Sequence, residues 1–191
     1  MPKHCQLSTR EAIIELADGY MRERGFNAFS FMDISHEVGI KTASIHYHFP
    51  TKTDLGVAII REHIQRVEDF KKEVAGLSSI KKISRFLSIY SKARSENKVC
   101  LAGSLTTDLN TVDDAMKAEL KLFAGNVLDW LIDTLKEGKK RKELDFNCAP
   151  RTKALSIITN IMAAVQLARL TGDEDFESVR NNILNELKPG K

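Results

Sequence analysis

Residues 30–55, SFMDISHEVGIKTASIHYHFPTKTDL, constrain the fold more strongly than any other part of the chain. Apolar residues recur there at helical spacing, Gly39 interrupts the pattern, and Pro50 stops it. The spacing predicts two short helices joined by a tight glycine turn, which is a helix-turn-helix. The second helix, over Thr42 to His48, is too short to be stable unless it docks on its neighbours.

Capping residues predict where the helices of this region begin. Ser8 with Glu11 and Ser30 with Asp33 have the spacing of capping boxes, and Thr51 is positioned to cap a fourth helix. Glycine, proline and asparagine mark the later breaks. The expected helices are 9–24, 31–38, 42–48, 52–75, 79–96, 101–110, 113–138, 150–171 and 175–187.

Strand signals are nearly absent, so we expect an all-α protein. Residues 1–55 are expected to form a three-helix head that carries the helix-turn-helix, and residues 56–191 a larger helical bundle. Gly76 to Ser79 is the most linker-like break within the bundle. No internal repeat is visible.

Composition excludes several classes of protein. The three cysteines, Cys5, Cys100 and Cys148, are far apart and lack metal-ligand spacing, so we expect no disulfide framework, metal or cofactor. No run of roughly 18 apolar residues and no signal-peptide pattern is visible, so we expect a cytoplasmic protein. Carboxylates such as Asp108, Asp113, Asp114 and Glu119 lack a paired nucleophile or histidine, so we expect capping roles and no enzyme.

The helix over Thr42 to His48 carries several side chains that can donate hydrogen bonds to phosphates or base edges: Thr42, Ser44, His46 and Tyr47. Lys41 precedes it, and Lys52 opens the next helix beside unpaired backbone N–H groups that favour phosphate. Residues 1–72 contain ten Lys plus Arg and ten Asp plus Glu, so any DNA affinity must come from where charges lie. The alternative is a solvated polar helix in an ordinary bundle.

The stretch GIKTASIHYHFPTKTDL, after GFNAFSFMDISHEV, resembles the DNA-binding signature of the TetR family of bacterial repressors. Gly39, Ile45, Tyr47-His48-Phe49, Lys52 and Asp54-Leu55 carry the match. The resemblance implies base or backbone contacts from Thr42, Ala43, Ser44 and Tyr47, and phosphate contacts from Ser30, His46 and Lys52.

Three positions depart from the family pattern: the family usually has Tyr at His46, often Gly or Pro at Ala43, and often Lys or Arg at Thr42. These departures put any inferred operator sequence in doubt. His46 beside a phosphate would make DNA binding tighten as the pH falls, because a protonated imidazole is a cation.

The family resemblance also implies a dimer and an effector cavity in the body. We expect the interface on the last two helices, where the apolar residues are Ile157, Ile158, Ile161, Val165, Ile183, Leu184 and Leu187. Candidate effector contacts are Phe86, Tyr90, Cys100, Met116, Phe123, Asn126, Trp130 and Met162. The alternative for both sets is an ordinary helical core.

Cys100 has a second interpretation. It precedes a helix start and lies near Lys98, which favours a thiolate, and its Cys-Leu context resembles a branch of the family that senses electrophiles and oxidants. The alternative is an inert buried cysteine. The basic run Lys139 to Lys142 is interpreted as a solvated helix end rather than a nucleic-acid patch.

The predicted function is therefore a ligand-responsive, homodimeric repressor that releases a palindromic operator when an effector binds its body. The alternative is an all-α small-molecule carrier or enzyme whose helix-turn-helix is purely structural. Salt-dependent DNA binding distinguishes the two.

Overall fold

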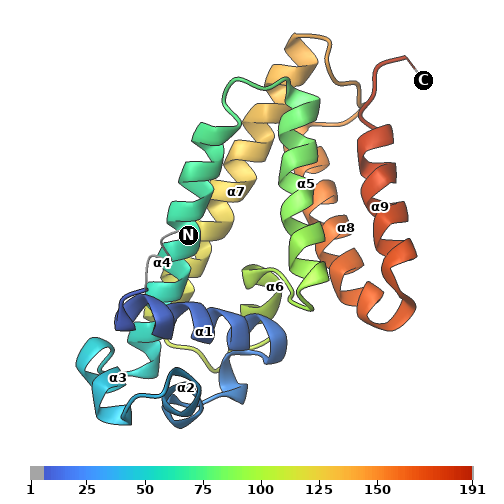
Figure 1. Ribbon diagram of the computed structural model, residues 1–191. Coiled ribbons are helices and arrows are strands. Elements are labelled where there is room, and N and C mark those ends of the chain that lie inside the picture. Colours follow the sequence, from blue (N-terminus) through green and yellow to red (C-terminus); the bar gives the residue numbers. More distant parts are fainter. Residues whose placement is uncertain (1–6, 191) are drawn as a thin grey trace, which may run out of the picture. The chain divides into compact units, whose positions relative to one another are not determined.

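The computed structural model describes residues 7–190, and these residues form helices and loops without a strand (Figure 1). Cys5 lies outside the described residues. The helices are α1 (Thr9–Arg24), η1 (Phe26–Ala28, a 3-10 turn), α2 (Phe31–Val38), α3 (Thr42–His48), α4 (Lys52–Glu73), α5 (Ser79–Ser95), α6 (Leu101–Leu105), α7 (Asp114–Lys140), α8 (Pro150–Thr171) and α9 (Asp173–Asn185). The predicted all-α class is confirmed.

The capping predictions are confirmed by geometry. Ser8 and Ser30 each accept the backbone N–H of the third helical residue, while Glu11 and Asp33 accept the N–H of the cap. Thr51 donates its hydroxyl and its N–H to Asp54, at 2.7 and 2.9 Å. The starts of α1, α2 and α4 are therefore set by local side chains.

The chain divides into two compact units. Among the described residues, unit 1 contains 7–63 and 101–121, and unit 2 contains 64–100 and 122–190. Both α4 and α7 pass from one unit into the other. The predicted functional boundary after residue 55 stays a prediction, but the compact units place α6 and the first turns of α7 with the helix-turn-helix.

The core of unit 1 joins α1, α2, α3 and α4. Its fully buried side chains are Ile13, Ala17, Met21, Ile34, Ile45, Leu55, Ile59 and Ile60. Tyr20 of α1 and Val38 of α2 are half-buried. Each helix contributes one apolar face, so no helix of this unit can be removed without exposing the others.

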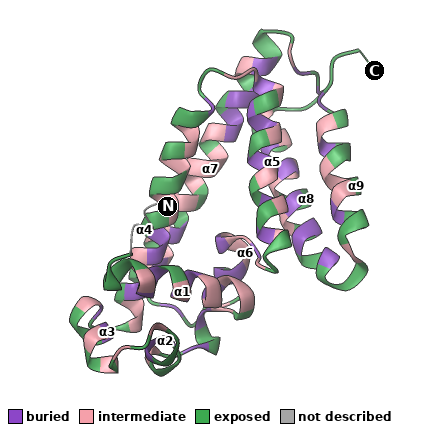
Figure 2. Ribbon diagram, viewed as in Figure 1, coloured by how far each residue is buried: buried purple, intermediate pink, exposed green. Residues whose placement is uncertain are grey.

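The core of unit 2 lies between α5, α7, α8 and α9. Ile83 and Leu87 of α5, Leu131 and Leu135 of α7, and the apolar residues of α8 and α9 are buried there. Lys82 pairs with Glu137 at 2.8 Å, and Arg94 bonds the carbonyl of Ala168 at 3.0 Å. Figure 2 shows buried segments on α5 and α8.

The helix expected over residues 101–110 ends at Leu105, so that prediction was too long. Threonine hydroxyls there bond nearby carbonyls: Thr106 bonds Ala102 at 2.8 Å, and Thr111 bonds Asp108 at 2.8 Å. Such local bonds compete with helix continuation. The loop that follows forms hydrogen bonds with the 3-10 turn η1 in unit 1.

One described helix, α8, is long and apolar enough to cross a membrane by length and composition, with a mean hydropathy of 1.4 over its most apolar window. Core helices of globular proteins pass the same test. Ala154, Ile157, Ile161, Val165 and Ala168 are all buried in the core of unit 2. We therefore interpret α8 as a core helix.

The left-handed backbone conformation of Gly39 can be tested by substitution. It ends α2 with φ 74° and ψ 32°, and no heavy atom lies within 4 Å of where a Cβ would stand. Gly39→Ala is expected to lower the free energy of unfolding by about 1–2 kcal/mol through backbone strain alone. Denaturant unfolding measures this change.

Gly125 of α7 is the matched control, because it has equally open surroundings and an ordinary helical backbone. Gly125→Ala is expected to raise the free energy of unfolding by about 0.5–1 kcal/mol. Equal effects of the two substitutions would contradict the left-handed turn at Gly39.

Candidate nucleic-acid interface

Helix α3 is held in unit 1 by its inner face. Ile45 is fully buried and Phe49, which follows the last turn, is 3% exposed. Figure 2 colours most of α3 as exposed or intermediate. A helix of seven residues gains little from its own backbone bonds, so these two side chains fix its position. The outer face is therefore presented rigidly to solvent.

The outer face of α3 borders a groove of about 420 Å³. Tyr47 is 84% exposed, which is unusual for an aromatic side chain and leaves its ring and hydroxyl open to a partner. Ala43 and Ser44 line the same groove. The three other lining residues, Thr9, Ile40 and His48, were not among the predicted contacts, and nothing local shows that Thr9 at the start of α1 lies beside α3.

The other predicted contacts on this side are partly engaged within the protein. Thr42 Oγ1 bonds Ser35 Oγ at 3.3 Å, and the Ser30 hydroxyl donates to Asp33 at 2.7 Å. Lys41 is exposed and precedes the first turn of α3. Their roles in DNA binding stay predictions, and among these three residues Lys41 presents the least encumbered group.

His46 has a defined orientation. Its Nδ1 lies 3.1 Å from the carbonyl oxygen of Pro50, and its ring packs edge-on against Phe31 with centroids 4.9 Å apart. A carbonyl only accepts, so Nδ1 carries the proton of this bond. Nε2 is then a bare acceptor in the neutral ring and becomes a donor only when His46 is protonated.

Lys52 does not extend toward solvent as a phosphate contact would. Its ammonium donates to the carbonyl of Phe26 at 2.6 Å and to the carbonyl of Phe29. It also lies over both rings, 4.7 and 4.2 Å from their centroids. Burial lowers the pKa of Lys52, and the carboxylates of Asp108 and Asp33 oppose that shift.

These contacts position the start of α4 within unit 1, and the predicted phosphate contact of Lys52 stays a prediction. The ammonium ties the first turn of α4 to the chain that leads into α2. Sequence reasoning could not find this, because the accepting carbonyls lie more than 20 positions earlier. Sequence reasoning also did not single out Arg10. Its guanidinium lies over the Phe49 ring, 5.2 Å from the ring centroid.

Helix α6 and the loop between α6 and α7 form hydrogen bonds with the end of α1 and with η1. Asp108 accepts the Phe26 N–H at 2.8 Å, and Asn27 donates to Thr111 at 2.7 Å. The Ser104 hydroxyl bonds the carbonyl of Met21 at the end of α1. Asp108, one of the carboxylates that we expected to cap helices, instead fixes η1 in unit 1.

Seven of the eight predicted effector contacts belong to unit 2, whereas Met116 belongs to unit 1 and packs against Gly56. Phe86 stacks on Tyr90 and on Trp130, with centroids 5.4 and 5.6 Å apart. Burial raises the pKa of the Tyr90 hydroxyl, and the nearby Cys100 thiol adds to that shift. The remaining members, Cys100, Phe123, Asn126 and Met162, are half-buried.

The structure shows these aromatic residues as packed core. Their role in effector binding stays a prediction. Cys148, by contrast, is exposed.

The predicted dimer residues are mostly covered by their own chain. Ile157, Ile161, Val165, Ile183 and Leu187 are at most 3% exposed, and they pack in the core that α8 and α9 share. Ile158 and Leu184 are half-buried. The exposed apolar side chains of α8 are instead Leu155, Leu167 and Leu170, at 43%, 55% and 87%.

The chain is similar to known regulatory proteins in sequence and in structure. Residues 13–59 match the family described as bacterial regulatory proteins, tetR family. A TetR transcriptional regulator from Legionella pneumophila is 36% identical; the match covers 95% of this chain and 98% of that one, with a TM-score of 0.86.

Two further likenesses are more distant. The HTH-type transcriptional repressor NemR of Escherichia coli strain K12 is 22% identical over 189 residues, 95% of this chain and 93% of NemR. A transcriptional regulator from Saccharomonospora viridis, solved in complex with choline, has a TM-score of 0.76 at 18% identity, over 95% of this chain and 98% of that one. On the strength of the Legionella match, the chain belongs to the TetR family of bacterial transcriptional regulators.

Proposed function

We propose that this protein is a homodimeric repressor that binds a palindromic operator through α3 and releases it when a small molecule binds unit 2. The observation that carries the proposal is the outer face of α3, which is fixed by Ile45 and Phe49 and presents Tyr47 almost fully exposed. The second helix of such a pair enters the major groove of DNA. A protein that reads chromosomal DNA works in the cytoplasm.

The dimer follows from the size of the reading surface. One seven-residue helix contacts too few base pairs for selectivity, so two copies on paired half-sites are required. Leu155, Leu167 and Leu170 lie on one side of α8 and supply an apolar face for the partner. We assign the interface to this side rather than to the buried residues inferred from the sequence.

Release of DNA is a population shift between two states. An effector that favours one arrangement of the two reading helices lowers operator affinity, and linkage requires operator DNA to lower effector affinity equally. The choline complex of the Saccharomonospora viridis regulator supports ligand binding in this fold, without naming the effector of this chain. The matching family is described as regulatory proteins, which favours a regulator over an enzyme.

Lys41 and Lys52 test the proposed interface as a pair. Lys41→Met is expected to weaken binding to a palindromic fragment from beside the protein's own gene and to reduce the log–log salt slope by about 0.9 for each phosphate that the variant no longer neutralises. Lys52→Met is expected to lower the free energy of unfolding by about 1–3 kcal/mol, since two carbonyls then have no donor, and to leave the salt slope unchanged.

Fluorescence anisotropy over a range of salt concentrations, with denaturant unfolding of each variant, separates the two effects. A reduced salt slope in Lys52→Met would show that its ammonium reaches phosphate after all. Failure of the unsubstituted protein to bind any such fragment in a salt-dependent way would refute the repressor itself.

His46 predicts the pH dependence of DNA binding. Because Nδ1 is engaged with Pro50, Nε2 can donate to a phosphate only in the protonated ring, so operator affinity is expected to rise as the pH falls. His46→Gln is expected to flatten this dependence, and His48→Gln to leave it in place. Anisotropy at constant ionic strength makes the measurement, and an unchanged pH profile in His46→Gln would contradict the assignment.

A further inference from the structure

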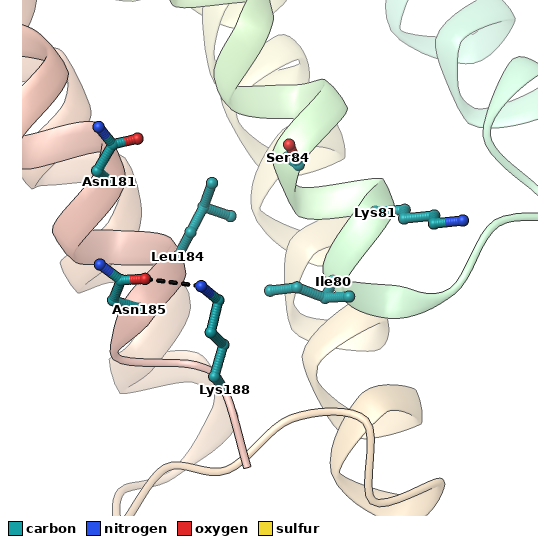
Figure 3. Close-up of a pocket in the computed structure, with 7 residues that line it drawn as sticks. All are labelled: Ile80, Lys81, Ser84, Asn181, Leu184, Asn185 and Lys188. Carbon is teal, nitrogen blue, oxygen red and sulfur yellow. Dashed lines mark hydrogen bonds between the residues drawn. The ribbon is translucent and has the colours of Figure 1, made fainter. Parts of the chain in front are cut away.

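Unit 2 carries a groove between the first half of α5 and the second half of α9 (Figure 3). Its volume is about 460 Å³, within the range of small-molecule sites. The lining residues are Ile80, Lys81, Ser84, Asn181, Leu184, Asn185 and Lys188. None of them belongs to the DNA-reading surface or to the predicted effector contacts.

The floor of this α5–α9 groove is apolar. Ile80 and Leu184 pack on the core of unit 2 from its edge, and each is half-buried. Figure 3 shows the two side chains pointing toward one another from the facing helices. They offer a hydrophobic strip that water covers when the groove is empty.

The rim of the groove is polar and positively charged. Lys188 donates to the Oδ1 of Asn185 at 2.8 Å, which orients that amide and leaves its NH2 group available as a donor. Asn181 is exposed one turn earlier on α9, and Ser84 is half-buried on α5. Lys81 extends from the α5 side, away from α9 in Figure 3.

The positive charge of the rim is not balanced locally. The groove is lined by two lysines and no acid, and neither lysine has an ion pair among the described residues. Nearby lysines do: Lys82 pairs with Glu137 and Lys153 with Glu186, both at 2.8 Å. An anion in the groove would meet donors without displacing an existing carboxylate.

We propose that the α5–α9 groove binds an organic anion that joins one carboxylate to a short apolar chain. The carboxylate accepts hydrogen bonds from the Lys188 ammonium and the Asn185 amide, and the chain covers Ile80 and Leu184. This site is separate from DNA binding, so the proposal stands or falls independently of the repressor function.

Octanoate is the probe, titrated into the full-length protein to about 10 mM, which covers millimolar dissociation constants. Heteronuclear NMR of the asparagine side-chain amides locates the binding. Saturable shifts of Asn181 and Asn185 are expected, and octanol, which lacks the charge, is expected to bind about tenfold more weakly. Absence of saturable shifts, or equal binding of octanol, would overturn the proposal.

Two variants make the site assignment specific. Lys188→Met keeps the apolar stem and removes the charge, so octanoate affinity is expected to fall about tenfold. Lys140→Met, which removes an exposed lysine outside the groove, is expected to change nothing. Ser84→Phe, which fills the groove, is expected to abolish the shifts; octanoate binding that survives both Lys188→Met and Ser84→Phe refutes the site.

Discussion

The structure depends on the docking of one helix that is too short to stand alone. Helix α3 has seven residues, and only Ile45 within it is fully buried. Its position is therefore set by its surroundings: the left-handed Gly39 before it, Phe49 after it, and the helices α1 and α2 that it contacts. Because Ile45 and Phe49 fix the underside, Tyr47 on the outer face is left exposed for recognition.

A second level of support holds the turn that leads into α2. The Lys52 ammonium reaches the carbonyls of Phe26 and Phe29 from one side, and Asp108 accepts the Phe26 N–H from the other. Lys52 and Asp108 thus support the same turn of unit 1 from within the protein. Lys41 and Arg10 are exposed cations near α3. Contacts from individually placed donors position a protein on DNA, whereas contacts to base edges specify the sequence.

Sequence reasoning succeeded where structure is decided locally. Ser8, Ser30 and Thr51 placed helix starts because a cap bonds residues three positions away. It failed where contacts between residues far apart in the sequence decide the structure. Lys52 is read as a surface cation until Phe26 and Phe29 are in place, and α8 is apolar around so much of its surface that its sequence cannot show which side α9 covers. Five of the seven predicted dimer residues are ones that the protomer itself buries, and their place in an interface stays a prediction.

Repression as proposed requires that two copies of α3 read DNA together. Hydroxyl-radical footprinting of a palindromic fragment from beside the protein's own gene tests this requirement most directly. We expect two protected patches on one face of the duplex, separated by one helical turn of about 34–36 Å or a multiple of it, and loss of both in Tyr47→Ala. A single patch, uniform protection along the fragment, or protection unchanged by Tyr47→Ala would contradict paired reading by α3.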